Sequence, residues 1–386
     1  MGGMATLNQP PVHRDAAAPA WLTTAFVSDR PTVGESAETS LDDPSSVLIH
    51  HPTVRIRSYS IVDMQALLRF PGVLRLDVPD SLLLTRPGVP DLPSALPVLR
   101  KERPAFVAIA DGQLVGFVRF SPRRPDGRWV ISAIGASTGV YAPEPVWEAL
   151  LAHGVRAAGL RGVRRLFARV PAGHPIVDTM HQGGWISYAR ETVFRTERLS
   201  GAGISGRELR LQEPADTWAI HQLYAAAAPR QVQEIEALTS HIWDMDKSRR
   251  TPRGVRQTGW LLEENGELAG YARFTRGSRA GMIDAVVIPG EGRHLGMLLD
   301  GVIAAHRPGR PRPVYCALRA YLMDMKDELT DRGFSAIGEQ ELLIRYTTAT
   351  ARTSQGEPVY FPVELRQGMP RRVPTFLEGQ PTDGTI

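Results

Sequence analysis

The sequence has little cysteine, lysine or asparagine, and no long apolar run. Cys316 is the only cysteine in 386 residues, which excludes an intramolecular disulfide and any cysteine-rich metal site. Three lysines stand among the 45 basic residues, and asparagine occurs twice; a GC-rich genome and a thermophilic host both produce this bias. No apolar run approaches the roughly 20 residues of a membrane span. We therefore expect a cytoplasmic protein with no metal and no membrane partner.

The charge of the chain gives no sign of a nucleic-acid partner. The formal net charge is +4 and the sequence pI is about 9.4. A nucleic-acid-binding protein usually concentrates its basic residues in one patch, whereas here they are scattered as separate pairs such as Arg164-Arg165 and Arg371-Arg372. The N-terminal segment also lacks the basic stretch and apolar core of a secretory signal.

An internal repeat dominates the sequence. The segment Gly112–Phe120 (GQLVGFVRF) matches Gly266–Phe274 (GELAGYARF), 154 residues later. A strand is expected before each segment, and the dipeptides Asp111-Gly112 and Asn265-Gly266 tolerate the positive φ of a tight hairpin turn. Each copy is therefore predicted to contain a β-hairpin at this place.

The match extends in both directions. Asp63 and Asp216, 153 residues apart, each stand near the start of a predicted helix, where a carboxylate accepts backbone N–H groups. Gly184-Trp185 and Gly333-Phe334, 149 residues apart, end a helix where glycine suits a left-handed cap. The repeat predicts two α/β domains of usual size, flanked by poorly ordered ends. The expected segments are 1–46 (disordered), 47–200 (first copy), 201–350 (second copy) and 351–386 (tail).

The order of elements in each copy resembles the GNAT fold of acyl-CoA-dependent N-acyltransferases. The second copy carries the better match, with a strand at Met282–Ile288, a glycine-rich turn at Pro289–Gly296, an apolar helix at Met297–His306 and the Gly333-Phe334 ending. The resemblance covers about 53–348. It implies a mixed α/β sheet in two tandem domains, with acetyl-CoA as co-substrate.

The resemblance implies a cofactor site in the second copy. Glycines at a helix start let backbone N–H groups approach a phosphate, and an arginine binds phosphate through two nitrogens. In the GNAT fold the fourth strand and its neighbour splay apart, so the exposed backbone of the fourth strand pairs with the pantetheine arm. The family's glycine pattern is shifted here, and a plain strand-to-helix turn remains the alternative. The expected cofactor-binding residues are Val286, Val287, Ile288, Gly290, Gly292, Arg293, His294 and Gly296.

The first copy departs further from the family pattern. Its loop holds one glycine, Gly139, and no arginine. Glu144 places negative charge near the phosphate position, and Pro143 and Pro145 each remove an N–H donor. We therefore expect this copy to be mainly structural.

The chemistry of acyl transfer to an amine suggests a base and an acid in the second copy. An alkyl ammonium has a pKa near 10.4, so a base must take its proton before attack on a thioester. Asp284 lies in the fourth strand, where family members often carry an acid, and Tyr321 lies in the following strand-to-helix region. The family's usual tyrosine is absent, because Met180 and Leu329 stand at its positions. A strand-edge aspartate and a half-buried aromatic are the structural alternatives for the two candidates.

Three functions remain open from the sequence. The first is an acetyl-CoA-dependent N-acyltransferase with its active site in the C-terminal copy and a small-molecule or peptide amine as acceptor. The second is a catalytically degenerate GNAT-like protein that binds a ligand or a protein. The third is a self-associating structural module, because a fold does not fix a function. Two tandem domains are expected to form a monomeric pseudo-dimer or a homodimer.

Overall fold

The computed structural model describes residues 54–68, 70, 73–76, 104–123, 127–137, 142–197, 199, 209–245, 256–277, 280–305 and 312–347. The predicted segments 1–46 and 351–386, and the linker at 200–206, lie outside the described residues. All described residues belong to one compact unit. We call 54–199 the N-terminal repeat and 209–347 the C-terminal repeat.

Most elements follow the same order in both repeats. The N-terminal repeat contains β1 (Arg55–Ser58), η1 (Ile61–Asp63), α2 (Met64–Leu68), β2 (Val73–Arg75), β3 (Ala105–Ala110), β4 (Gln113–Arg123), β5 (Arg128–Ala136), α5 (Pro143–Gly159), β6 (Arg165–Pro171), α6 (Ile176–Gln182) and β7 (Ile186–Thr196). The C-terminal repeat contains β8 (Leu209–Leu211), η3 (Pro214–Asp216), α7 (Thr217–Ala227), α8 (Arg230–Glu236), η4 (Ser240–Trp243), β9 (Arg256–Glu264), β10 (Glu267–Arg276), β11 (Gly281–Val287), α9 (Gly292–Ala305), β12 (Val314–Arg319), η5 (Ala320–Met325), α10 (Lys326–Thr330) and β13 (Ser335–Tyr346). The predicted repeat is confirmed.

The local features that the sequence predicted are present in both repeats. The hairpin turns place Asp111 and Asn265 at φ 49° and 54°, each followed by a glycine at positive φ. Gly184 and Gly333 end their helices at φ 76° and 78°. The next residue's N–H then bonds back across the cap, from Trp185 to Met180 and from Phe334 to Leu329, at 3.0 Å each. The same hairpin-turn and helix-cap conformations therefore occur in both repeats.

The predicted helix-start aspartates also make matching contacts. Asp63 accepts the backbone N–H of Ser60 at 2.8 Å, and two nitrogens of Arg57 bond its carboxylate. Asp216 is held in the same way by Arg210. Arg57 lowers the pKa of Asp63 through its side-chain hydrogen bonds, which outweigh the opposing effect of burial. Each short 3-10 helix is therefore tied to the strand before it.

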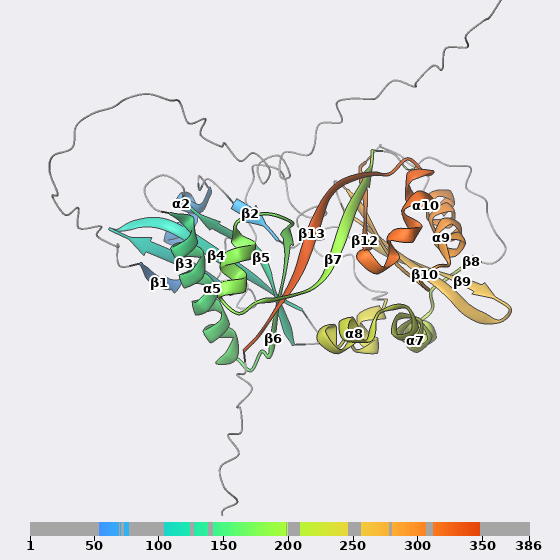
Figure 1. The fold of residues 1–386 in the computed structure, drawn as a ribbon, viewed down its shortest axis with the longest axis horizontal. Coiled ribbons are helices and arrows are strands. Elements are labelled where there is room, and N and C mark those ends of the chain that lie inside the picture. The colour runs from blue at the N-terminus through green and yellow to red at the C-terminus, as the bar shows by residue number, and fades with distance from the viewer. Residues whose placement is uncertain are drawn as a thin grey trace, which may run out of the picture. The chain divides into compact units, whose positions relative to one another are not determined.

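The described strands form one continuous mixed sheet in which the two repeats exchange their last strands. The order is β1-β3-β4-β5-β6-β13-β7-β12-β11-β10-β9-β8, with β2 paired to β5. Strand β13 lies between β6 and β7, and β7 lies beside β12, all antiparallel (Figure 1). Each repeat's final strand therefore completes the other repeat's part of the sheet. Backbone hydrogen bonds between strands of different repeats join the two repeats into one sheet.

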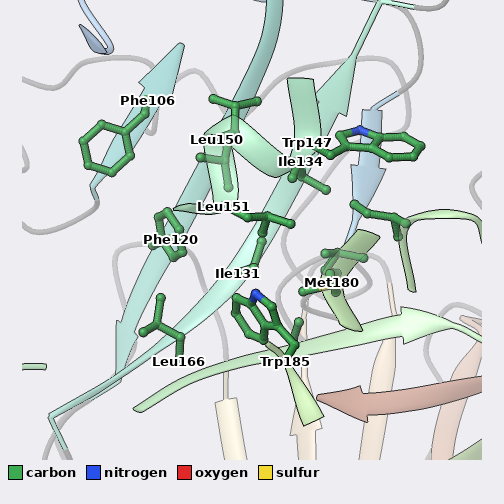
Figure 2. Packing of buried hydrophobic residues seen from close by; sticks show 14 of the residues in the cluster. Phe106, Phe120, Ile131, Ile134, Trp147, Leu150, Leu151, Leu166, Met180 and Trp185 are labelled. Atoms are coloured by element: carbon green, nitrogen blue, oxygen red, sulfur yellow. The ribbon is translucent and has the colours of Figure 1, made fainter. Parts of the chain in front are cut away.

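The core of the N-terminal repeat lies between α5 and the strands. Trp147, Leu150 and Leu151 of α5 face Phe120 and Ile131 of β4 and β5 (Figure 2). Helix α9 covers β9 to β11 in the C-terminal repeat in a similar way, with a core that includes Leu295, Leu298, Leu299 and Val302. A Cβ atom on Gly270 of β10 would stand 2.9 Å from Leu298, so this glycine permits the close approach of the helix.

One predicted helix differs from the structure at its start. Helix α9 begins at Gly292 and not at Met297, so the glycine-rich turn supplies the first turn of the helix. Elsewhere in the C-terminal repeat, α8 ends where Ala237 takes φ 40°, and a separate 3-10 turn, η4, follows it.

Candidate functional site

Strands β11 and β12 separate part-way along their length. They pair in parallel from Gly281 and Val314 as far as Ile283 and Cys316. Beyond this point β11 pairs with β10 on its other side, and no described strand pairs with its β12-facing edge. Unpaired backbone groups at a strand edge accept an extended ligand as an added strand. The splay predicted from the resemblance is therefore confirmed.

The corresponding edge in the N-terminal repeat is covered by the chain itself. Strands β5 and β6 pair only at Trp129 and Val130. Strand β2 then pairs antiparallel with Ala133–Gly135 of β5, and the N–H of Leu76 continues the ladder to the carbonyl of Ser132 at 3.1 Å. Leu76 is fully buried in the core. The two repeats therefore differ at the same place in the sheet.

The start of α9 follows β11 directly. Gly290 takes φ 87°, a conformation that side chains other than glycine disfavour, and its N–H donates to Oδ2 of Asp324 at 3.0 Å. The N–H groups of Gly292 and Arg293 bond to no acceptor among the described residues. A helix start with free N–H groups favours an anion.

Carboxylates surround this helix start. Glu264 accepts hydrogen bonds from Arg293 and from the buried His294, the latter at 3.0 Å. The hydrogen bond from His294 and the charge of Arg293 lower the pKa of Glu264. Glu328 lies against Gly296, where a Cβ would overlap its carboxylate. His294 therefore holds Glu264 through a hydrogen bond and Gly296 leaves room for Glu328, while Arg293 remains 69% exposed.

The two predicted catalytic residues lie on β11 and η5. Asp284 stands opposite Arg273 of β10, and its Oδ2 is 3.4 Å from Nη2 of Arg273. Val286, two residues on, belongs to a core cluster against which Tyr321 packs, so both candidates face this part of the molecule. Burial raises the pKa of Tyr321, although the nearby Arg319 opposes this. Tyr321 therefore keeps its proton at neutral pH.

A buried polar cluster that the sequence did not reveal lies beside Tyr321. Glu236 at the end of α8 accepts hydrogen bonds from Tyr224 and Arg319 at 2.8 Å and from Tyr188 at 3.1 Å. Burial alone would raise the pKa of Glu236, but the charge of Arg319 and the bond from Tyr224 lower it. Arg319 also pairs with Glu191 of β7. The cluster is therefore built from both repeats.

The sequence carries no signal of this cluster. Glu236 is buried, and Arg319 and Glu191 stand opposite each other in the β12–β7 ladder, so their contact depends on the strand exchange. Cys316 on β12 is also buried, and burial raises its pKa to about 12.

Comparison with known proteins identifies the fold. No protein-family model and no curated protein matches the sequence. A GCN5-related N-acetyltransferase from Sphaerobacter thermophilus matches with TM-score 0.50 at 14% identity, covering 77% of this chain and 96% of that one. The chain has the GNAT fold. A tandem GNAT protein from the clavulanic acid biosynthesis pathway (TM-score 0.46, 14% identity, 77% and 99% coverage) and a GNAT-family acetyltransferase from Colwellia psychrerythraea (0.39, 11%, 76% and 99%) are also similar.

Two features of the C-terminal repeat suit an acyl-CoA molecule. The open edge of β11 suits an extended thioester arm, and the free N–H groups at the start of α9 suit phosphates. The Gly290 N–H already donates a hydrogen bond to Asp324. Because Asp324 is exposed, its side chain can turn to solvent and release that donor. The described residues contain no cluster suited to a metal ion. None of the described helices has the length and apolar character to cross a membrane.

Proposed function

We propose that the chain is an acetyl-CoA-dependent N-acyltransferase that acetylates an amine through its C-terminal repeat. The observation that carries this proposal is the open β12-facing edge of β11, since the same edge of β5 is filled by β2 in the N-terminal repeat. The expected domains 47–200 and 201–350 then have different roles. The first is structural and the second binds the co-substrate.

The residues at equivalent positions support this asymmetry. Helices α5 and α9 begin 149 residues apart, as do β6 and β12. The positions of Arg293, Gly296 and Tyr321 are therefore held in the N-terminal repeat by Glu144, Trp147 and Ala172 respectively. The ladders with β4 and β10 likewise match Asp284 to Ala133. At these four matched positions, the groups suited to phosphate binding and proton transfer occur in the C-terminal repeat and not in the N-terminal one.

Binding is assigned to backbone more than to side chains. The unpaired edge formed by Val286, Val287 and Ile288 pairs with the pantetheine arm, and the N–H groups of Gly290 and Gly292 donate to the pyrophosphate. Arg293 leaves Glu264 and binds a phosphate through two nitrogens. His294 then holds Glu264 alone, and Gly296 leaves room for the Glu328 side chain. His294 and Gly296 therefore act by maintaining the conformation of the helix start.

The co-substrate supplies an activated thioester, and the chain supplies proton transfer. Asp284 takes a proton from the acceptor amine at its carboxylate oxygen. Arg273 orients this carboxylate from the neighbouring strand. Tyr321 holds a proton at Oη because burial raises its pKa, and it gives this proton to the departing thiolate. N–H groups on the open edge of β11 donate to the developing oxyanion.

A catalytically degenerate, ligand-binding GNAT protein is the second candidate. The observation that favours it is the ring of carboxylates at the start of α9, formed by Glu264, Glu291, Asp324 and Glu328. Negative charge at this place opposes a pyrophosphate. Asp284 also pairs with Arg273 at 3.4 Å, so the carboxylate proposed as the base is already engaged.

Calorimetric titration with acetyl-CoA separates the two candidates. The variants are Arg293→Glu and a matched control, Arg230→Glu, whose exposed guanidinium pairs with Glu234 on α8. Binding by the wild type and the control that is lost in Arg293→Glu supports the acyltransferase and justifies a screen of amine acceptors. Wild-type protein that binds nothing at millimolar acetyl-CoA supports the degenerate protein.

The assignment of the base has its own test. Asp284→Asn is expected to bind acetyl-CoA as the wild type does and to lose most of its turnover with any acceptor found. Full turnover in this variant would refute the role of Asp284. The variant keeps the shape of the side chain, so a loss of binding would instead point to a structural role.

A further inference from the structure

A pocket of 440 Å³ lies on the N-terminal repeat, away from the open edge of β11. Helix α5 forms one wall, the end of α6 another, and the last residues of β13 close it. The lining residues are Glu148, Leu151, Ala152, Val155, Arg156, Gly159, Leu160, Thr179, Gly183, Trp185, Arg345 and Thr347. This volume is within the range of small-molecule sites, roughly 300–1,000 Å³.

The pocket exists because the N-terminal repeat lacks an ion-pair network that fills the same place in the C-terminal repeat. There, Arg332 binds both oxygens of Asp300 at 2.7 and 2.8 Å and Glu328 at 2.8 Å. The residues 149 positions earlier are Gly183, Leu151 and Thr179. All three line the pocket. None of the three carries a charge, and Gly183 and Thr179 are smaller than Arg332 and Glu328, which leaves space where the other repeat is packed.

Strand exchange brings an arginine without a partner into this space. Arg345 of β13 pairs through its backbone with β6 of the other repeat. Its guanidinium lies against Gly184, where a Cβ would stand 3.1 Å from Cζ. Arg345 makes no hydrogen bond or ion pair with any described residue, and its Nε is buried. Its two terminal nitrogens are not among the buried atoms, so an anion in the pocket can accept hydrogen bonds from them.

The remaining lining groups define the ligand. Arg156, exposed and without a partner among the described residues, adds a second cation. The carboxylate of Glu148 at the rim opposes one of these charges, which leaves a net positive pocket. Leu151 and Trp185, each 3% exposed, form an apolar wall. The pocket therefore combines guanidinium donors with a surface suited to a ring or short chain.

We propose that this pocket binds a small organic anion, with a carboxylate or phosphate group on Arg345 and an apolar part against Leu151 and Trp185. The planar guanidinium offers two parallel hydrogen bonds to such a group. The proposal is independent of acetyl-CoA binding, because the pocket and the start of α9 share no residue.

The test is calorimetric titration of the full chain with two pairs of probes, benzoate against benzamide and phenyl phosphate against phenol. One anion of the two pairs is expected to bind saturably, and its neutral partner at least about tenfold more weakly, since charge-assisted hydrogen bonds are lost. The better anion tells carboxylate from phosphate. Equal binding of charged and neutral partners, or no binding by either anion, would overturn the proposal.

Three variants assign any binding to the pocket. Arg345→Gln is expected to weaken the preferred anion at least about tenfold, whereas Arg230→Gln in the other repeat leaves its affinity unchanged. Thr179→Glu introduces the carboxylate that Glu328 supplies in the C-terminal repeat, and it is expected to occupy Arg345 and abolish binding. Circular dichroism confirms that each variant is folded. Unchanged affinity in a folded Arg345→Gln would assign the anion to another place and refute the proposal.

Discussion

Removing the carboxylate of Asp324 should tighten acetyl-CoA binding if the phosphates lie at the start of α9. In the structure this carboxylate holds the Gly290 N–H at 3.0 Å, so a phosphate must displace it. A hydrogen bond to a charged group is worth about 1.5 kcal/mol at the lower end of its range. A carboxylate that has turned away to about 7 Å still repels a unit charge by about 0.6 kcal/mol in water. Asp324→Ala removes both costs, for about 2 kcal/mol or roughly a 30-fold gain in affinity.

Calorimetry at two salt concentrations tests the reasoning. The repulsive part of the gain should shrink at high salt, because exposed charges are screened, whereas the gain from the free N–H should persist. The matched control is Asp331→Ala, which removes the same charge from an exposed residue just after α10. Affinity in Asp324→Ala that equals or falls below the wild-type value would refute the placement of the phosphates.

Three further predictions follow from the structure. Acetyl-CoA should bind once per chain, because β2 fills the N-terminal slot; a calorimetric stoichiometry of two would contradict this. The pKa of Asp63 is lowered by Arg57, so its carboxylate stabilises the fold above the unfolded pKa near 3.9. That contribution is lost as the pH falls through the lower pKa of the folded state. The urea midpoint of the wild type, measured against pH, should therefore fall in this range, and Asp63→Asn should lack this fall. Arg319→Met should cost about 3–5 kcal/mol in urea unfolding by leaving the buried Glu236 without its cationic partner; a loss under 1 kcal/mol would contradict the cluster's role.

The parts of the fold that rest on local chemistry could be predicted from the sequence. Asp111-Gly112 and Asn265-Gly266 favour one turn type, and Gly184 and Gly333 favour one helix end, so both hairpins and both caps were predicted correctly. Side chains also alternate along β11, where Ile283 and Val287 join the core under α9 and Val286 joins the opposite cluster. These features depend on a few adjacent residues.

The parts that depend on distant pairing could not be predicted. Strands β7 and β13 read as ordinary final strands, and nothing in their alternation says which repeat they join. The contact of Arg319 with Glu191 follows only from that choice. The pairing of β2 with β5 has the same character, because the three residues Val73–Arg75 carry no signal of their partner. The roles of Asp284, Tyr321 and the α9 residues stay predictions until acetyl-CoA binding is measured.

Strand exchange gives the N-terminal repeat a part in the proposed active site although its own slot is filled. Strand β7 runs along β12 and brings Glu191 to Arg319 and Tyr188 to Glu236. These contacts fix the buried cluster against which Tyr321 sits, so the position of the proposed proton donor depends on both repeats. In the N-terminal repeat, β2 covers the edge of β5 that would bind a ligand, while β7 of the same repeat packs beside β12 of the C-terminal repeat. The β12-facing edge of β11 therefore stays open in the described sheet, and the exchange of β7 and β13 makes the residues beside that edge depend on both repeats.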